Sequence, residues 1–196
     1  MTDIFIRGEV AVYSRSIGAV LVALLAAAAL AGPAAAQEPA FRGMFVRDSA
    51  AGDNMEQVIT ATLPHIKSTL GKIFKGTARK RLREVNRPYG WIEFTPAAGS
   101  MTTQTDHWNG EWKLSAPDSG TVTWRRKTAD GDIETLRVAS FLEGRTYTHR
   151  FIAEDGVRTN TYSLSPDGQT LTISVHVVSP KLSEPMNYKL VYKARS

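Results

Sequence analysis

Apolar and polar residues alternate with a period of two along most of the second half of the chain, as in strands with one buried face. The clearest run places Leu171, Ile173 and Val175 on one face and Thr172 and Ser174 on the other. We predict six strands in this region: Thr121–Lys127, Ile133–Leu142, Arg145–Ala153, Val157–Leu164, Thr170–Val178 and Pro185–Lys193.

Acidic-glycine pairs separate most of these strands, and such pairs supply the positive-φ residue that a tight hairpin needs. The four pairs are Asp130-Gly131, Glu143-Gly144, Asp155-Gly156 and Asp167-Gly168. Their even spacing predicts hairpins of uniform length. The second half of the chain should therefore form an antiparallel meander.

The period changes in the first half of the chain. Phe41–Arg47 is predicted to be a short strand that ends at the polar segment 48–53. Apolar residues then recur at helical spacing from Asn54 onwards: Met55, Val58, Ile59, Thr62, Ile66, Leu70, Ile73 and Phe74. Pro64 either kinks one helix or starts a second helix after a break at Leu63. With the basic stretch Thr77–Val85, the helical segment covers about residues 54–85.

Three shorter strands are predicted between the helical segment and the meander, at Trp91–Thr95, Met101–Trp108 and Glu111–Leu114. The total is then about nine or ten antiparallel strands. The pattern predicts a mostly β fold, an antiparallel up-and-down β-barrel with a helical insertion after the first strand.

The N-terminus has the pattern of an export signal. Arg7 and Arg15 precede the apolar run Ile17–Leu30, and Ala34-Ala35-Ala36 provides a small-residue cleavage site. We expect a signal peptide at 1–36, a single domain at 37–196 and a periplasmic or secreted protein. The alternative is a retained membrane anchor, although the run is short for a span. The sequence contains no cysteine, so disulfides and thiolate metal sites are excluded.

The formal net charge of the chain is +5. A basic exported protein meets anionic lipid or acidic polymers more often than nucleic acid. The positive residues concentrate in 72–87, and we single out Arg79, Lys80, Arg81 and Arg83 as a surface that docks on an anionic membrane. The alternative is a solvated helix face whose apolar side covers the barrel.

The inward strand faces carry aromatic residues and a few polar ones. We predict a ligand site formed by Trp124, Arg126, Tyr147, His149, Phe151, Arg158, Tyr162 and Tyr188. Aromatic walls would hold the apolar body of a ligand, and an arginine would bind its acidic end. No acidic residue shares these faces within the same strands, so the arginine's partner is expected from outside. The alternative is a barrel packed solid by its own side chains, with the arginines near strand ends.

Catalytic signatures are absent from the sequence. It has no G-x-S-x-G, phosphate-binding loop or dinucleotide-binding glycine pattern, and no pair of its four histidines has metal-ligand spacing. Glu93, Asp106, Glu111 and Glu134 lie on or beside predicted strands, where solvent exposure explains them as well as a carboxylate pair does. We predict no catalytic residue, no metal and no cofactor.

The segment Thr159–Arg195 resembles the closing hairpin of exported bacterial lipocalin-like proteins, which belong to the calycin group. The residues that carry the resemblance are Asn160-Thr161-Tyr162-Ser163-Leu164-Ser165-Pro166-Asp167-Gly168-Gln169-Thr170-Leu171-Thr172 and Tyr188-Lys189-Leu190-Val191-Tyr192-Lys193. Gly43-Met44-Phe45 stands where lipocalins carry Gly-x-Trp, with Phe45 in place of the tryptophan. The helical segment departs from a plain lipocalin. The resemblance implies a barrel that binds small hydrophobic molecules, and it implies no catalytic residue.

Three functional hypotheses follow. The leading one is noncatalytic binding of a small hydrophobic or amphipathic molecule. Its most specific version is that the bound molecule is anionic. The second is an envelope protein with a solid barrel that docks on membrane or acidic polymer through its basic helix. The third is a small enzyme with an unrecognised site.

Overall fold

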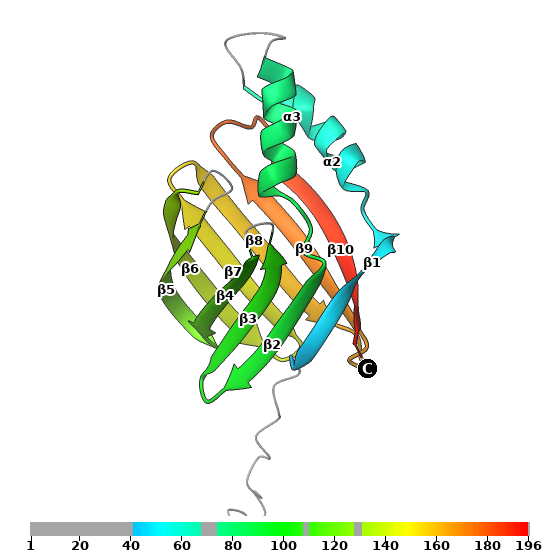
Figure 1. The fold of residues 1–196 in the computed structure, drawn as a ribbon, viewed down its shortest axis with the longest axis vertical. Coiled ribbons are helices and arrows are strands. Elements are labelled where there is room, and N and C mark those ends of the chain that lie inside the picture. Colours follow the sequence, from blue (N-terminus) through cyan, green and yellow to red (C-terminus); the bar gives the residue numbers. More distant parts are fainter. Residues whose placement is uncertain (1–40, 68–73, 108–109, 128–130, 196) are drawn as a thin grey trace, which may run out of the picture. The chain divides into compact units, whose positions relative to one another are not determined.

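The protein forms a nearly closed antiparallel barrel in a computed structural model that describes residues 41–67, 74–107, 110–127 and 131–195 (Figure 1). The ten strands follow the order β4-β3-β2-β1-β10-β9-β8-β7-β6-β5. They are β1 (Gly43–Gly52), β2 (Trp91–Ala97), β3 (Ser100–His107), β4 (Gly110–Pro117), β5 (Ser119–Lys127), β6 (Ile133–Glu143), β7 (Thr146–Ala153), β8 (Gly156–Leu164), β9 (Thr170–Val178) and β10 (Met186–Ala194). The predicted fold class is therefore confirmed.

The barrel closes through β1, which pairs with both β2 and β10. All other pairs join strands that are consecutive in sequence, as expected of an up-and-down meander. The ladder does not continue between β4 and β5. At this seam the indole nitrogen of Trp124 donates a hydrogen bond of 3.0 Å to the backbone oxygen of Lys113.

The glycine of each predicted acidic-glycine turn has a positive φ, as the hairpin interpretation requires. Gly156 shows the second reason for a glycine in such a turn. A Cβ atom there would lie 2.5 Å from the backbone oxygen of Val178, so any larger residue would push β9 away.

The first strand is longer than the sequence suggested. β1 continues through the polar segment that was expected to break it, and its pairing with β10 shifts register between Arg47 and Gly52. The backbone NH of Asp53 donates to Lys189, while the Asp53 carboxylate accepts from the NH of Lys189. The polar residues therefore form a bulge in a continuing strand rather than its end.

Two α-helices follow β1 and lie at one end of the barrel (Figure 1). α2 (Met55–Thr62) starts at Asn54, whose side chain accepts from the backbone NH groups of Glu56 and Gln57. A 3₁₀ turn containing Pro64 (Leu63–His65) ends the helix, so the proline separates two helices. α3 (Phe74–Val85) is the second helix. The predicted apolar positions Leu70 and Ile73 lie outside the described residues.

The inward faces predicted from the alternation form the core. Leu171, Ile173 and Val175 are 0–2% exposed, and Met186, Tyr188, Leu190 and Tyr192 are 0–3% exposed. They pack with Phe41, Phe94, Tyr147 and Tyr162, whose rings meet at tilted and edge-to-face angles. No helix among the described residues is long and apolar enough to span a membrane.

Candidate ligand-binding cavity

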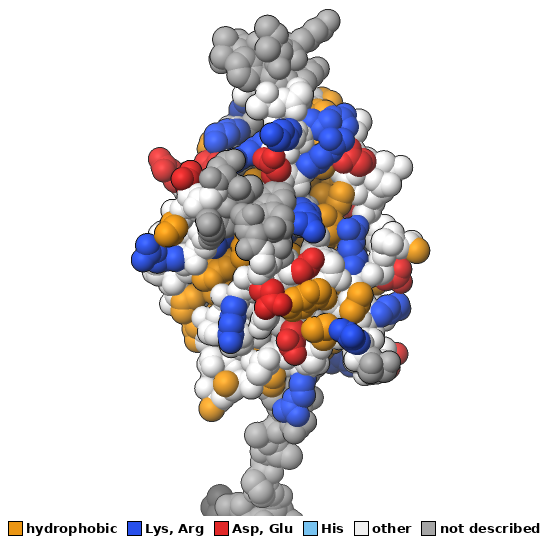
Figure 2. Space-filling view, viewed as in Figure 1, with side chains coloured by type: hydrophobic (Ala, Val, Ile, Leu, Met, Phe, Trp, Pro, Cys, Tyr) orange, Lys and Arg blue, Asp and Glu red, His pale blue; other side chains and the backbone are white. Residues whose placement is uncertain are grey.

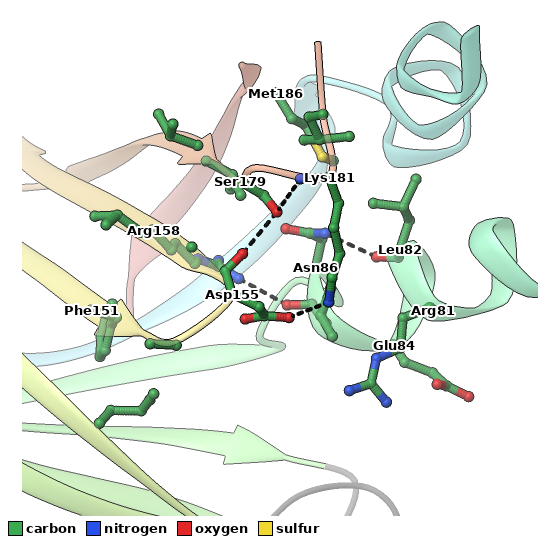
Figure 3. Close-up of a pocket in the computed structure, with 18 of the residues that line it drawn as sticks. Arg81, Leu82, Glu84, Asn86, Phe151, Asp155, Arg158, Ser179, Lys181 and Met186 are labelled. Carbon is green, nitrogen blue, oxygen red and sulfur yellow. Dashed lines mark hydrogen bonds and ion pairs between the residues drawn. The ribbon is translucent and has the colours of Figure 1, made fainter. Parts of the chain in front are cut away.

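A cavity of about 580 Å³ lies between α3 and the inner faces of the strands at the helical end of the barrel (Figure 3). Its walls come from α3, from β4–β10 and from the loops between them. The apolar part of the lining consists of Ile66, Ala78, Leu82, Val85, Tyr89, Trp112, Trp124, Leu136, Phe151, Ala153, Val157, Val177, Val178, Leu182 and Met186. The polar and charged lining residues cluster on α3, at Arg126 and Glu134, and around Arg158.

Three aromatic side chains form one wall beside the β4–β5 seam. The rings of Trp112 and Trp124 meet nearly at right angles with centroids 5.5 Å apart. Trp124 also contacts Phe151, with ring centroids 5.9 Å apart. Strand alternation places all three on inward positions of β4, β5 and β7. The result is a large, rigid apolar surface suited to the body of a ligand.

Arg126 has a partner within the protein. Its Nε and one terminal nitrogen lie 2.7 and 2.6 Å from Oε2 of Glu134, which sits opposite it on β6. The guanidinium also lies 4.8 Å from the ring centroid of Trp112 and 5.8 Å from that of Trp124. The expectation that this arginine needs a partner from outside the protein is therefore wrong, because the hairpin register supplies Glu134.

Arg158 is held by neutral acceptors. Its Nε donates to Oδ1 of Asn160 at 2.9 Å, and its Nη1 donates to the backbone oxygen of Val85 at 3.0 Å. Figure 3 shows Arg158 in the wall of the cavity. Val85 is the last residue of α3, so the guanidinium meets the negative end of that helix. Within the described parts of the chain, no carboxylate lies within ion-pair distance of Arg158. This cation therefore lacks the charge partner that Arg126 has.

Asn160 extends this network inward by donating to the hydroxyl of Tyr162 at 3.1 Å. On the neighbouring strand β7, the side chain of His149 is 1% exposed. The centroid of its imidazole lies 4.4–5.7 Å from the ring centroids of Tyr147, Phe151 and Tyr162. Neither of its ring nitrogens has a hydrogen-bond partner among the described residues. Burial lowers the pKa of His149 to about 3, so the ring is neutral at physiological pH.

The rim of the cavity is tied together across three segments (Figure 3). Lys181, after β9, forms an ion pair of 3.0 Å with Asp155 in the β7–β8 turn. Ser179 donates to the backbone oxygen of Asp155 at 2.7 Å. Asn86, just after α3, accepts a bond from the hydroxyl of Tyr188 on β10. The first two bonds join the two strand connections at the opening, and the third joins the end of α3 to β10.

The predicted docking residues lie on α3. Arg83 makes two bonds of 2.6 Å to the carboxylate of Glu56 on α2, and Arg79 lies 3.5 Å from the same group. The bonds from Arg83 hold the pKa of Glu56 below its ordinary value. Lys80 and Arg81 are exposed, and the apolar side of the helix packs Leu82 against the core. Figure 2 shows Lys and Arg side chains gathered at this end of the molecule.

The predicted ligand-site residues divide into two groups. Trp124, Arg126, Phe151 and Arg158 line the cavity. Tyr147, His149, Tyr162 and Tyr188 are buried in the packed interior next to it. Both the open lumen and the filled core considered from the sequence are thus present, in different parts of the barrel.

Several residues that line the cavity were not predicted from the sequence. Trp112 had a usable signal, because it lies on an inward position of a predicted strand. Glu134 could be paired with Arg126 only through the register of the β5–β6 hairpin. Leu82, Val85 and Asn86 reach the cavity because α3 folds over the barrel end, which the sequence offered only as an alternative. No cluster of three or more His, Asp or Glu suited to a metal ion occurs among the described residues.

Comparison with known proteins adds information about the fold. No protein-family model matches the chain, and no curated protein matches it. Many solved structures are similar. A fatty-acid-binding protein from Manduca sexta aligns over 79% of this chain and 98% of its own length, with 14% identity and a TM-score of 0.52. The fatty-acid-binding protein of Schistosoma mansoni, solved in complex with arachidonic acid, covers 80% and 97%, with 14% identity and a TM-score of 0.50.

A third similar structure is an abundant heat soluble (SAHS) protein from Ramazzottius varieornatus. It covers 80% of this chain and 96% of its own, with 11% identity and a TM-score of 0.54. The architecture is therefore that of the fatty-acid-binding proteins, a β-barrel of the calycin type. Identities this low establish the fold and leave the function to the site itself.

Proposed function

We propose that the protein is a noncatalytic binding protein that holds a small hydrophobic or amphipathic molecule in the cavity under α3. The observation that carries this proposal is the cavity itself. Its volume of about 580 Å³ falls within the range of about 300–1,000 Å³ that is typical of small-molecule sites. Its lining is mostly apolar with a few placed polar groups, and similar barrels include proteins named for fatty-acid binding.

The finer form of the proposal is that the ligand has an acidic end, which Arg158 binds. Arg126 is already neutralised by Glu134, whereas Arg158 has only amide and carbonyl acceptors among the described residues. A carboxylate is a stronger acceptor for a guanidinium than a neutral oxygen is. The acid would therefore compete for Arg158 and approach the end of α3.

The experiment is a titration with decanoic acid and with 1-decanol, followed by the fluorescence of Trp112 and Trp124 in the cavity wall. The protein should bind both and prefer the acid. Arg158→Gln should weaken the acid about tenfold, because it removes one charge-assisted interaction, and should leave the alcohol almost unchanged.

The control is the double variant Arg126→Gln with Glu134→Gln, which removes the neutralised pair without changing the net charge. It should retain the preference for the acid. Equal effects of both variants would remove the acidic-end proposal and leave the binding proposal intact. No binding of either probe would contradict the binding proposal itself.

We also propose that the protein acts in the periplasm or outside the cell, after cleavage following Ala36. The support is the sequence of a positive leader, an apolar run and a small-residue site. Sequencing of the N-terminus of protein recovered from the envelope or medium should give Gln37. An intact Met1 on that protein would contradict the proposal.

A second candidate function is docking on an anionic membrane surface through α3. Its support is the exposed Lys80, Arg81 and Arg83 of α3 together with the exposed apolar side chain of Val85. Docking and ligand binding are compatible, because α3 carries both the basic surface and part of the cavity wall.

A further inference from the structure

The inner faces of β7 and β8 form a ladder of paired side chains that leads inward from the cavity. The pairs are Phe151 with Arg158, then His149 with Asn160, then Tyr147 with Tyr162. The first pair lines the cavity and the third lies in the packed core. Inward positions on a strand recur every two residues, a step of about 7 Å. His149 therefore lies one step below the cavity wall.

Two side chains of this ladder have unsatisfied polar atoms, the hydroxyl of Tyr147 in the core and the imidazole of His149 one pair nearer the cavity. The His149 side chain is 1% exposed, and both ring nitrogens lack a hydrogen-bond partner among the described residues. Two neighbouring polar side chains, Asn160 and Ser140, already make other hydrogen bonds. Both ends of the Asn160 amide are bonded, to Arg158 and Tyr162, and Ser140 donates to the backbone oxygen of Pro117. Buried polar groups are normally hydrogen-bonded, so this imidazole calls for a partner that the protein does not supply.

We propose that His149 binds an uncharged hydroxyl group of the ligand, which reaches it when the ring of Phe151 turns aside. This inference rests on the proposed binding function and deepens it. Phe151 both lines the cavity and contacts the imidazole, with ring centroids 5.7 Å apart, so it is the side chain between the two. The cavity would then prefer oxygen-bearing molecules to hydrocarbons of the same shape.

The uncharged character of the bound group follows from the chemistry of the site. A neutral imidazole has one donor nitrogen and one acceptor nitrogen, and a hydroxyl group can pair with whichever of them faces the cavity. A carboxylate can only accept, so it could pair only with the donor nitrogen. No charged side chain among the described residues forms a hydrogen bond or ion pair with His149, so a buried anion would have no compensation there. An acidic group is better placed at Arg158, which lies one pair nearer the cavity.

The direct test uses 1-decanol and 1-chlorodecane, which share an apolar chain and differ in hydrogen bonding at one end. Nitrogen NMR of the histidine rings in the intact protein reports whether each imidazole nitrogen is hydrogen-bonded. Decanol should shift the signals of His149, and chlorodecane should leave them unchanged. If the signals already indicate a bonded ring without a probe and decanol does not change them, an ordered water serves the ring and the inference is overturned.

The paired variants test the same contact through affinity. His149→Phe keeps an aromatic ring and removes both nitrogens, so it should weaken decanol about fivefold and leave chlorodecane unaffected. The control is His176→Phe on the exposed face of β9, which should bind as the parent does. Equal affinity of the parent for both probes would overturn the inference and leave the proposed function standing. Failure of both probes to bind would overturn both.

Discussion

Ile173 is an example of a side chain whose burial the alternation predicts. It lies on the inward face of β9 and is 1% exposed, whereas Thr172 faces outward and is half-buried. Ile173→Ala should reduce the free energy of unfolding by about 2–5 kcal/mol, because it leaves a cavity in a packed core. Thr172→Ala should cost much less. Denaturant titrations of the two variants check this, and equal losses would show that the facing is misassigned.

His149 gives a prediction about pH. Its pKa is lowered to about 3 in the folded protein, while an unfolded histidine titrates near 6.5. Between these values the unfolded chain binds the extra proton, so stability is fully present above about pH 6.5 and falls as the pH drops. From pH 7 to pH 5 the loss should be about 2 kcal/mol. His149→Phe should remove most of this slope in urea titrations at the two pH values, and an unchanged slope would contradict the neutral, buried ring.

The partners of the two inward arginines, Arg126 and Arg158, could not be predicted from the sequence. Alternation predicts that Arg126 and Arg158 face inward, and they do. Their partners, Glu134 and the carbonyl of Val85, depend on hairpin register and on where α3 docks. Residue patterns specify direction, because direction is local. Contacts between distant segments are not local, and Val85 lies 73 residues from Arg158.

The strands and helices were predictable in number and type, and less so in their ends. Strands β6, β7 and β8 match because glycine turns bound them on both sides. β1 is longer than predicted because a bulge tolerates polar residues that would otherwise indicate a turn. Pro64 indicated a break without fixing its form, since a proline can kink a helix or end it. In this chain the 3₁₀ turn ends α2.

The basic surface of α3 gives a prediction at the level of the helix. If this surface docks on membranes, the protein should bind vesicles that contain anionic lipid, and salt should weaken that binding. Changing Arg79, Lys80, Arg81 and Arg83 to Gln should weaken it further, as measured by vesicle sedimentation. A matched control changes four exposed basic residues away from α3, namely Arg42, Arg150, Lys193 and Arg195. Loss of binding in both variants, or in neither, would leave a solvated helix face as the explanation.

The whole barrel combines two kinds of interior. Aromatic and aliphatic side chains from β1, β2 and β7–β10 pack one part solid, while the part next to α3 and the β4–β5 seam encloses the cavity. The sequence left an open lumen and a filled core as alternatives, because barrel dimensions and helix docking are properties of the assembled molecule. The division also explains why only four of the eight predicted ligand-site residues line the cavity.

Ala153 allows the cavity to be closed without touching its polar groups. It lies at the end of β7 and lines the cavity, so Ala153→Phe should fill part of the volume and weaken decanol binding about tenfold or more. Ala97→Phe adds the same ring at an exposed position of β2, away from the lining residues, and serves as the control.

Native mass spectrometry of the purified protein with decanol counts the molecules that are bound to the intact chain. If the cavity under α3 binds a ligand, each chain should carry one small molecule, either retained from the source or added as decanol. This adduct should persist in Ala97→Phe and be lost in Ala153→Phe. A bare chain in the presence of excess decanol, or an adduct that Ala153→Phe retains in full, would contradict the claim that the cavity under α3 binds a ligand.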